Sequence, residues 1–268
     1  MSRDVEVSKI VYVFQPPSVD STVVAATESL ASSEVPIVTN ANGWMTKRAS
    51  SPQIELEHVV LPDPLDPRLV VLGQPGSERA RRYRLLRHRL LSHSDPRIIA
   101  VTSARSGEGK TTCALNLALA MAEDSMARVL LLEANLLRPA LARIIHFAPS
   151  ESLVENVTQS TNVGPPYPAV SVSGTRLHVA VLRDESLEDV RLDRTLLSLV
   201  LHDLRHAYDY IVIDAAAVLE SGDVDVVGEC SSGVIMTARA GHSRENDMRR
   251  AITQLAPTPM LGSVLIDA

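Results

Sequence analysis

The sequence predicts an α/β protein with a mostly parallel, doubly wound sheet that carries helices on both faces. Short apolar runs recur from residue 97 onward, among them RIIAVTSA, ARVLLLEA and YDYIVIDAA, and longer helical patterns separate them. Runs that are apolar throughout are typical of strands buried on both faces, as in parallel sheets. The first run also leads through a glycine-rich turn into a helical pattern, the order in which such folds join a strand to a helix.

The elements follow in chain order from an amphipathic helix that precedes the sheet. Residues 77–92, SERARRYRLLRHRLLS, place Tyr83, Leu86 and Leu90 at helical spacing and arginines on the other faces. Beyond it we expect strands at 97–103, 128–133, 177–182, 209–214, 233–238 and 261–266. We expect helices at 109–124, 187–206 and 243–255, and shorter helical pieces from the second strand to about residue 158.

The N-terminal quarter of the chain has a different composition. Residues 1–66 are rich in Ser, Thr, Pro, Val and Glu and show no sustained helical or alternating pattern. We therefore predict a disordered or extended N-terminal segment at 1–66 and one folded domain at 67–268. Within the N-terminal segment, IELEHVV is expected only as a weak extended piece that leans on the domain.

Composition and charge exclude several classes of protein. The net charge of −6 and the pI near 5.8 argue against a surface that binds nucleic acid non-specifically, so no nucleic-acid partner is expected. No run approaches the roughly 18 apolar residues of a spanning helix, and the first residues lack the pattern of a secretory signal. Cys113 and Cys230 lack metal-ligand spacing. These features predict a cytoplasmic protein that reaches a membrane only through a partner.

The glycine-rich turn after the first strand predicts a P-loop, and with it the fold of a P-loop NTPase. Gly107 and Gly109 let successive N–H groups point at phosphate oxygens at a helix N-terminus. Lys110 is one of three lysines in the chain and can reach the outer phosphates, while the Thr111 hydroxyl can take a position on Mg²⁺. Ala104 replaces the first glycine of the GxxxxGK[ST] pattern. The expected nucleotide-binding residues are Arg105, Ser106, Gly107, Glu108, Gly109, Lys110, Thr111 and Thr112.

Three stretches resemble a known family in order and spacing: VTSARSGEGKTTCALNLALAMA, RVLLLEANLLRPALARI and YDYIVIDAAAVLESGDVDVVGECSSGVIMTARAG. The chain from about residue 77 is similar to the cytoplasmic domains of bacterial tyrosine autokinases in capsule and exopolysaccharide synthesis. Those proteins share the deviant Walker ATPase group with the ParA and MinD proteins. The resemblance implies ATP and Mg²⁺ as cofactors, an inner-membrane polysaccharide co-polymerase as partner, and a homo-oligomer, either a ring or a dimer, when nucleotide is bound. It also implies a location at the cytoplasmic side of the inner membrane, held there by the partner.

The resemblance assigns roles to residues of this chain. It places Lys110, Asp214 and Glu133 in catalysis, and Thr111, Asp214 and Glu133 at the metal. Arg105 stands where the ParA and MinD relatives carry a signature lysine that reaches the neighbouring subunit's nucleotide. Whether the arginine does similar work is open.

The sequence also departs from the family in ways that bear on catalysis. Glu133-Ala134-Asn135 replaces an Asp-Ala-Asp motif, and Asn135 cannot act as a base. Ala215-Ala216-Ala217 replaces a small residue followed by two prolines. The aspartate after this stretch is kept as Asp223. All five tyrosines lie at or before residue 210, so the sequence as printed has no tyrosine cluster at its C-terminal end.

The arginine-rich helix offers two alignments to the family's Glu-x-x-Arg-x-x-Arg pattern, which contributes to ring assembly. One alignment uses Arg84 and Arg87 and puts Arg81 in the place of the glutamate. The other is a literal copy one turn earlier, at Glu78, Arg81 and Arg84. Either the pattern has moved by a turn, or the ring contact has changed, or the arginines form a solvated basic face.

Three functions stay open on the sequence alone. The favoured one is an ATP-binding regulator of exopolysaccharide or capsule-type polysaccharide biosynthesis and export, descended from the autokinases. The second is an active partitioning or positioning ATPase of the ParA and MinD type. The third is a tyrosine kinase that acts on a separate membrane partner. The sequence leaves open whether the chain is a weak ATPase, a degenerate protein-tyrosine kinase or no enzyme.

Overall fold

The computed structural model describes residues 10–13, 52–93, 96–148, 153, 164–182, 191–256 and 258–266. Within these residues a nine-stranded sheet has the order β1-β9-β8-β3-β7-β4-β6-β5-β2. Its strands are β1 (Ile10–Val13), β2 (Ile54–Val59), β3 (Ile98–Ser103), β4 (Val129–Ala134), β5 (Tyr167–Val172), β6 (Leu177–Val181), β7 (Tyr210–Ala215), β8 (Gly233–Arg239) and β9 (Met260–Ile266). The helices are α1 (Val70–Gly73), α2 (Glu78–His93), α3 (Lys110–Ala122), α4 (Leu141–Ile145), α6 (Arg194–Ala207), α7 (Asp223–Glu229) and α8 (Glu245–Gln254).

The six central strands are parallel, as the sequence predicts. β9, β8, β3, β7, β4 and β6 run in one direction. The reversed strands lie at the two edges: β5 is antiparallel to β6, β2 is parallel to β5, and β1 is antiparallel to β9. The carboxyl ends of β3, β7 and β4 therefore meet at one edge of the sheet, which is where open α/β sheets bind their ligands.

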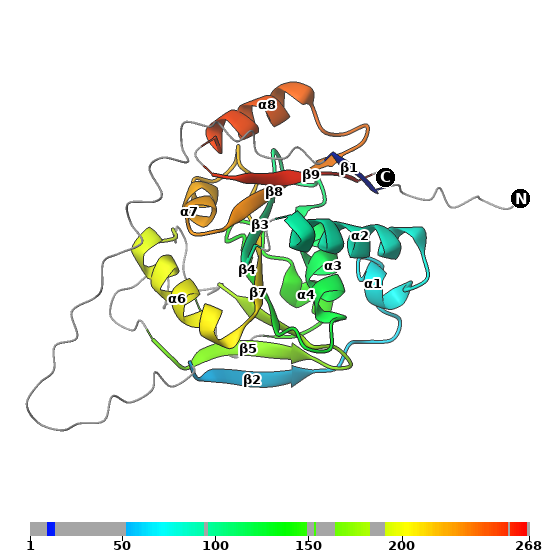
Figure 1. Cartoon of the computed structure of the whole chain (residues 1–268), viewed down its shortest axis with the longest axis vertical. Coiled ribbons are helices and arrows are strands. Elements are labelled where there is room, and N and C mark those ends of the chain that lie inside the picture. The colour runs from blue at the N-terminus through cyan, green and yellow to red at the C-terminus, as the bar shows by residue number, and fades with distance from the viewer. Residues whose placement is uncertain are drawn as a thin grey trace, which may run out of the picture.

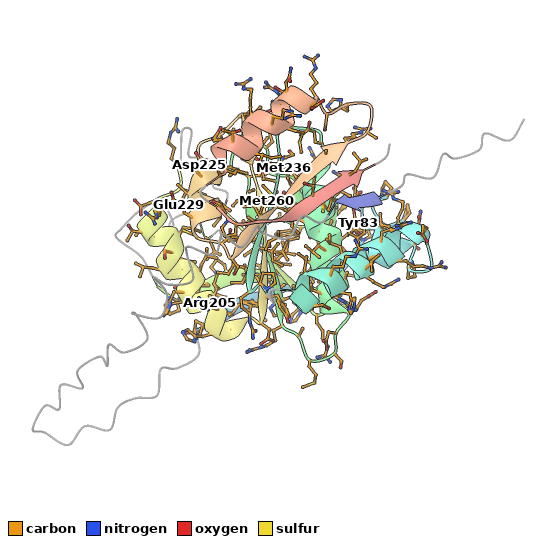
Figure 2. The ribbon with its side chains drawn as sticks, turned by 45° about the horizontal axis from the view of Figure 1, so that its top comes forward. Tyr83, Arg205, Asp225, Glu229, Met236 and Met260 are labelled. Atoms are coloured by element: carbon orange, nitrogen blue, oxygen red, sulfur yellow. The ribbon has the colours of Figure 1, made fainter. Side chains whose placement is uncertain are left out.

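Helices cover both faces of the sheet, which confirms the predicted fold class (Figure 1). On one face, α1, α2, α3 and α4 pack on inward-pointing residues of alternate strand positions, such as Val101, Leu131 and Val212. On the other, α6, α7 and α8 pack on the intervening positions, such as Ala100 and Leu132. Figure 2 labels Tyr83 on the first side and Met236 and Met260 on the second. The alternation explains why the strands read as continuous apolar runs.

Most predicted elements are present, with several differences. The predicted helix 187–206 begins only at Arg194, because the side chain of Asp193 accepts a hydrogen bond from Leu196 N and caps the helix there. Residues 187–190 lie outside the described residues, as does most of the predicted helical stretch between α4 and residue 158. Strand β5 and helices α1 and α7 were not predicted. The predicted helix 77–92 corresponds to α2.

Two strands from the range 1–66 belong to the sheet. β2 pairs with β5 along six register positions, from Ile54 with Tyr167 to Val59 with Val172. β1 pairs with β9 at the opposite edge (Figure 1). The piece expected to lean on the domain is therefore an edge strand. The other residues of 1–51 lie outside the described residues, so the predicted boundary at residue 66 stays a prediction.

None of the helices in the described part of the chain combines the length and the apolar character needed to cross a membrane.

Candidate nucleotide site

The turn between β3 and α3 has the backbone shape of a P-loop. Gly107 and Gly109 both have φ of 83°, in the left-handed region that favours glycine, and Gly109 is the N-cap of α3. A Cβ at Gly109 would also meet the terminal Cδ1 of Ile266, a side-chain end that can move, so the left-handed backbone is the main reason for glycine at this position. The loop thus ends at the N-terminus of α3, where the helix dipole favours an anion.

The structure brings Lys110, Thr111, Asp214 and Glu133 together at the carboxyl edge of the sheet. Lys110 and Thr111 begin α3, Asp214 ends β7 beside β3, and Glu133 is its register partner on β4. Lys110 is 6% exposed and Asp214 is completely buried. The predicted catalytic and metal residues therefore come from three elements that the topology makes neighbours.

Asp214 is the most perturbed ionisable group of the site. Burial raises the pKa of its carboxyl to about 7, although Lys110 and the hydroxyl of Thr111 act to lower it, and the nearby charge of Glu133 raises it further. Neither carboxylate oxygen receives a hydrogen bond of ordinary geometry from the described residues. Buried oxygens without donors are costly unless a cation is bound, and carboxylate and hydroxyl oxygens are the ligands that Mg²⁺ prefers. Asp214 and Thr111 thus fit a magnesium ion.

Glu133 has a structural task that the sequence analysis missed. Its Oε1 accepts hydrogen bonds from the backbone N–H groups of Ala140 and Leu141, the second at 2.8 Å, at the start of α4. Part of the carboxylate predicted as a metal ligand is therefore engaged as a helix cap. Asn135, two residues later, donates from Nδ2 to the carbonyl of Arg138 at 2.9 Å and so holds the same turn.

The first half of the P-loop is tied to the segment that begins α8. Arg105 is exposed, and its Nε lies 3.0 Å from Oδ2 of Asp247. Asp247 is the main cause that raises the pKa of this guanidinium, with smaller contributions from Glu220 and Glu108. Glu108 is buried: it accepts the N–H of Arg105 at 2.9 Å and the hydroxyl of Ser243 at 2.6 Å. The carboxylate of Glu108 therefore links the P-loop backbone to Ser243.

The segment after Asp214 runs alongside the P-loop. The N–H groups of Val218 and Leu219 donate to the carbonyls of Ser103 and Ala104, at 2.9 and 3.2 Å. Beyond them, the N–H of Ser106 donates to Oε1 of Glu220 at 2.9 Å. Sequence reasoning missed Glu220, Ser243 and Asp247, because each lies more than a hundred residues from the loop and only the fold brings it there.

Asp223 lies in the region after this segment but acts as an anchor. Its Oδ1 accepts the N–H of Leu192 at 3.2 Å, and its Oδ2 accepts the hydroxyl of Ser221 at 3.0 Å. These bonds join the start of α7 to the residues that precede α6. The carboxylate of Asp223, at the position that the family motif predicts, therefore has its hydrogen-bond partners within the same chain.

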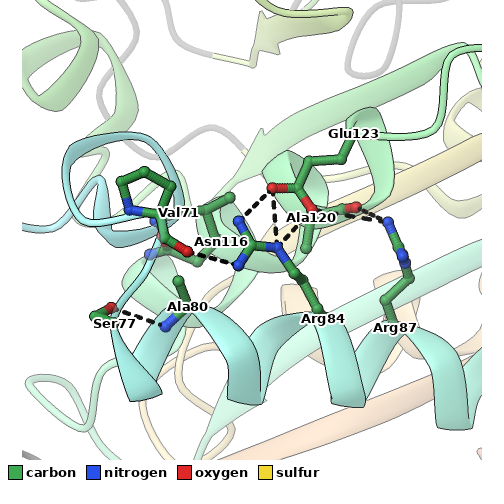
Figure 3. Close-up of polar contacts among 9 residues, drawn as sticks. Val71, Ser77, Ala80, Arg84, Arg87, Asn116, Ala120 and Glu123 are labelled. Atoms are coloured by element: carbon green, nitrogen blue, oxygen red, sulfur yellow. Dashed lines mark hydrogen bonds and ion pairs between the residues drawn. The ribbon is translucent and has the colours of Figure 1, made fainter.

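The arginines on α2 bind the same chain (Figure 3). Arg84 donates to both carboxylate oxygens of Glu123, which follows α3, at 2.6 to 3.0 Å, and to the carbonyl of Pro75 at 2.7 Å. Arg87 donates to the carbonyl of Ala120 at 2.6 Å. Neither arginine of the first alignment is therefore part of a freely solvated face.

Comparisons with known proteins agree with this geometry. The chain matches the family described as AAA domain over residues 96–237. The succinoglycan biosynthesis transport protein ExoP of Rhizobium meliloti strain 1021 is 27% identical over 207 residues, which are 73% of this chain and 26% of ExoP. The tyrosine-protein kinase YwqD of Bacillus subtilis strain 168 is 23% identical over 205 residues, which are 74% of this chain and 84% of YwqD.

A solved structure supports the same placement. The kinase domain of VpsO is 28% identical, with a TM-score of 0.59 over 70% of this chain and 93% of that domain. This chain corresponds to most of YwqD and of the VpsO domain, but to about a quarter of the length of ExoP. From the family match over more than half of its residues and the P-loop geometry, we conclude that the chain belongs to the AAA domain family of P-loop proteins and is similar to bacterial tyrosine kinase domains.

Proposed function

We propose that this chain is a cytoplasmic ATP-binding regulator of exopolysaccharide or capsule-type polysaccharide biosynthesis and export. The observation that carries the proposal is the buried pair of Asp214 oxygens beside Lys110 and Thr111 on a P-loop; neither oxygen receives a hydrogen bond of ordinary geometry from the described residues. A buried carboxylate in that state is suited to a magnesium ion, and the ammonium group of Lys110 beside it is suited to a polyphosphate. The relatives named for polysaccharide transport and for tyrosine kinase activity direct the choice of process.

Each residue of the site has a part in holding the nucleotide. Lys110 would bind the outer phosphates through its ammonium group, while the N–H groups at the start of α3 would bind the inner ones. Thr111 and Asp214 would hold Mg²⁺, which would offset the charge of the outer phosphates. Glu133 would influence the metal mainly through its charge, because one of its carboxylate oxygens accepts a hydrogen bond from the backbone at the start of α4.

Two features favour a regulator over an autokinase. Tyr83, Tyr167 and Tyr208 are each at most 4% exposed, so none of these three hydroxyls is an accessible phosphate acceptor. The second acidic motif also offers no general base at Asn135, whose amide is committed to the carbonyl of Arg138. Loss of a general base at such a position costs about 10²–10⁴ in rate, so we expect weak hydrolysis or none.

The partners follow from the family. We propose that the chain acts at the inner membrane through a polysaccharide co-polymerase, and that nucleotide promotes a ring or a dimer of this chain. Arg105 lies exposed at the mouth of the loop, where a residue that acts on a neighbouring subunit has to be. A second candidate function is that of a tyrosine kinase for a separate membrane protein. It is favoured because the relative YwqD is named as a tyrosine-protein kinase.

A partitioning ATPase has less support. Its basic DNA-binding surface would have to lie on α2, but there the guanidinium groups of Arg84 and Arg87 donate hydrogen bonds to acceptors of this chain. The net charge of −6 also opposes DNA binding. Salt-dependent retention on DNA would reverse this ranking, and phosphotyrosine on a co-expressed co-polymerase would favour the kinase.

Calorimetry with Mg²⁺ and ATP tests the proposal. We expect saturable binding to the wild type and a loss of at least about tenfold in affinity for Lys110→Ala, because a charge-assisted hydrogen bond contributes about 1.5–3 kcal/mol. Arg249→Ala is the matched control, since this exposed cation pairs with Glu245 on α8. Absence of heat with the wild type would remove the proposal.

A genetic test addresses the process. In the source organism, deletion of the gene is expected to abolish or shorten the exported polysaccharide. The wild-type gene should restore it and Lys110→Ala should not. Unchanged polysaccharide in the deletion strain would contradict the assignment to this process while leaving nucleotide binding intact.

A further inference from the structure

One anion-binding N–H group of the P-loop is already occupied by the protein. The N–H of Ser106 donates to Oε1 of Glu220 at 2.9 Å. N–H groups of such loops normally serve phosphate oxygens, and a carboxylate oxygen offers the same charge and the same acceptor geometry. The side chain of Glu220 is exposed, so it can leave the loop without disturbing the core.

The position of Ser106 in the loop indicates which phosphate Glu220 replaces. Ser106 lies at the β3 end of the loop, whereas Gly109 and Lys110 at the α3 end provide the N–H groups for the inner phosphates. Glu220 arrives from the segment that follows Asp214, and this segment pairs with Ser103 and Ala104. The contact therefore lies on the side of the metal carboxylate, where the terminal phosphate of a triphosphate belongs.

The surrounding charges oppose a further anion at this end of the loop. Arg105 is the nearby cation, and its guanidinium is paired with Asp247. Glu108 adds a second carboxylate, held by the N–H of Arg105 and by Ser243. With Glu220 in place, a terminal phosphate held by the ammonium group of Lys110 would also meet three carboxylates, those of Glu220, Glu108 and Asp247, around Arg105.

We propose that Glu220 occupies the place of the terminal phosphate on the P-loop and thereby determines nucleotide specificity, favouring ADP over ATP. ATP binds only when its terminal phosphate displaces the carboxylate from Ser106, whereas ADP binds beside it. The inference rests on the proposed nucleotide-binding function and adds to it the residue that distinguishes the two nucleotides.

Calorimetry with Mg²⁺-ATP and Mg²⁺-ADP tests the inference on the full chain. Glu220→Gln keeps the size and an acceptor oxygen but removes the charge. We expect it to raise the affinity for ATP about tenfold and the affinity for ADP less than about twofold, because the competing charge-assisted bond is lost. Glu229→Gln is the matched control: this exposed carboxylate pairs with Arg194 at 2.8 Å, away from the loop, and should change neither affinity.

The possible results separate this inference from the proposed function. If wild type and Glu220→Gln bind both nucleotides with the same ATP to ADP ratio, Glu220 does not set specificity, although nucleotide binding stands. Equal gains for both nucleotides also overturn the inference. If neither protein binds either nucleotide, the proposed function fails and this inference fails with it.

Hydrogen exchange at Ser106 gives a second readout that does not depend on affinity. In the nucleotide-free protein, Glu220→Ala should speed the exchange of the Ser106 N–H relative to wild type. Mg²⁺-ATP should restore the protection in this variant, and Mg²⁺-ADP should not. Unchanged exchange in the nucleotide-free variant, or equal protection by both nucleotides, would contradict the assignment.

Discussion

Asp214 is a single residue whose burial in the candidate site lowers the stability of the folded protein. The fold buries its carboxyl completely between Lys110, Thr111 and Glu133, without a hydrogen bond of ordinary geometry from the described residues. The pKa of the carboxyl rises from 3.8 to about 7 because burial outweighs the attraction of Lys110. The site proposed for a cation and a phosphate is thus unfavourable in the ligand-free protein, as expected where function and stability compete.

This cost predicts a pH dependence of stability. In the unfolded chain Asp214 ionises near its ordinary pKa, while in the folded protein it keeps its proton up to about pH 7. The folded state therefore loses stability as the pH rises from about 4 to about 7, by an amount on the order of 4 kcal/mol. Asp214→Asn removes this loss, so we expect it to be more stabilising, relative to wild type, at pH 8 than at pH 5. Urea unfolding of nucleotide-free protein measures the difference, and a pH-independent difference would be inconsistent with a raised pKa.

Glu133 permits a test that separates its structural role from its predicted metal role. Glu133→Asp shortens the side chain, so its carboxylate no longer reaches the N–H groups of Ala140 and Leu141. We expect a loss of about 1–3 kcal/mol in the free energy of unfolding, because a charge-assisted cap at α4 is broken. Glu133→Gln keeps an acceptor oxygen and is expected to lose less. Guanidinium unfolding compares the two variants; equal stability of Glu133→Asp and wild type would show that the cap does not matter.

At the scale of elements, the P-loop helix is fixed to the chain that leads into the domain. Asn116 of α3 is fully buried: its Oδ1 accepts the N–H of Val71 at 2.9 Å, and its Nδ2 donates to the carbonyls of Arg68 and Thr112. At the other end of α3, Glu123 binds Arg84 of α2 (Figure 3). α1, α2 and α3 therefore form one packed unit behind the site.

The contact between Arg84 and Glu123 decides between the alternatives for the arginine-rich helix. If it serves this chain, a double-mutant cycle of Arg84→Ala and Glu123→Ala should give a coupling of about 0.5–1 kcal/mol, the usual range for partly exposed pairs. Chemical unfolding supplies the free energies, and sedimentation with nucleotide reports the oligomer. If the coupling energy is zero and Arg84→Ala alone abolishes the oligomer, Arg84 forms a contact between subunits instead.

The elements that the sequence predicts are those with a clear pattern of their own. β3, β4 and β7 are continuous apolar runs, and α2 and α3 have long helical periods. β5 was missed because Pro168 and two preceding prolines mark a break, and because the strand reverses direction at the sheet edge. α7 was missed because a short DVDVVGE stretch has low helix propensity, so its contacts with the rest of the fold determine it.

The same distinction holds for the candidate site. Lys110, Thr111 and Asp214 lie in local motifs, and the topology brings them together as the sequence predicts. Glu220 and Asp247 carry no motif, and their contacts with the loop depend on how β7 and α8 lie against β3. The cap formed by Glu133 depends on the turn before α4, and no periodic pattern in the sequence predicts this turn.

At the scale of the whole molecule, the N-terminal range contributes to both edges of the sheet. β1 continues the sheet beyond β9, and β2 continues it beyond β5. The segment around β2 also reaches both cores: Ile54 packs on the side of α6, and Val59, Leu61 and Leu65 pack on the side of α3. A domain that begins at residue 67, as the composition predicts, would lack all four of these contacts.

Two truncations measure what this segment contributes. One variant begins at residue 52 and the other at residue 67, so both lack β1 and only the second lacks β2. We expect the second to melt about 4–8 °C below the first, because the loss of four apolar contacts and an edge strand should cost about 2 kcal/mol or more. Point variants provide a matched pair within β2: Ile54→Ala removes a packed side chain, whereas Leu56→Ala removes one that is 39% exposed. Only Ile54→Ala should lower the melting temperature appreciably. If the two truncations melt together and the two alanine variants behave alike, β2 adds nothing to stability and the domain begins at residue 67.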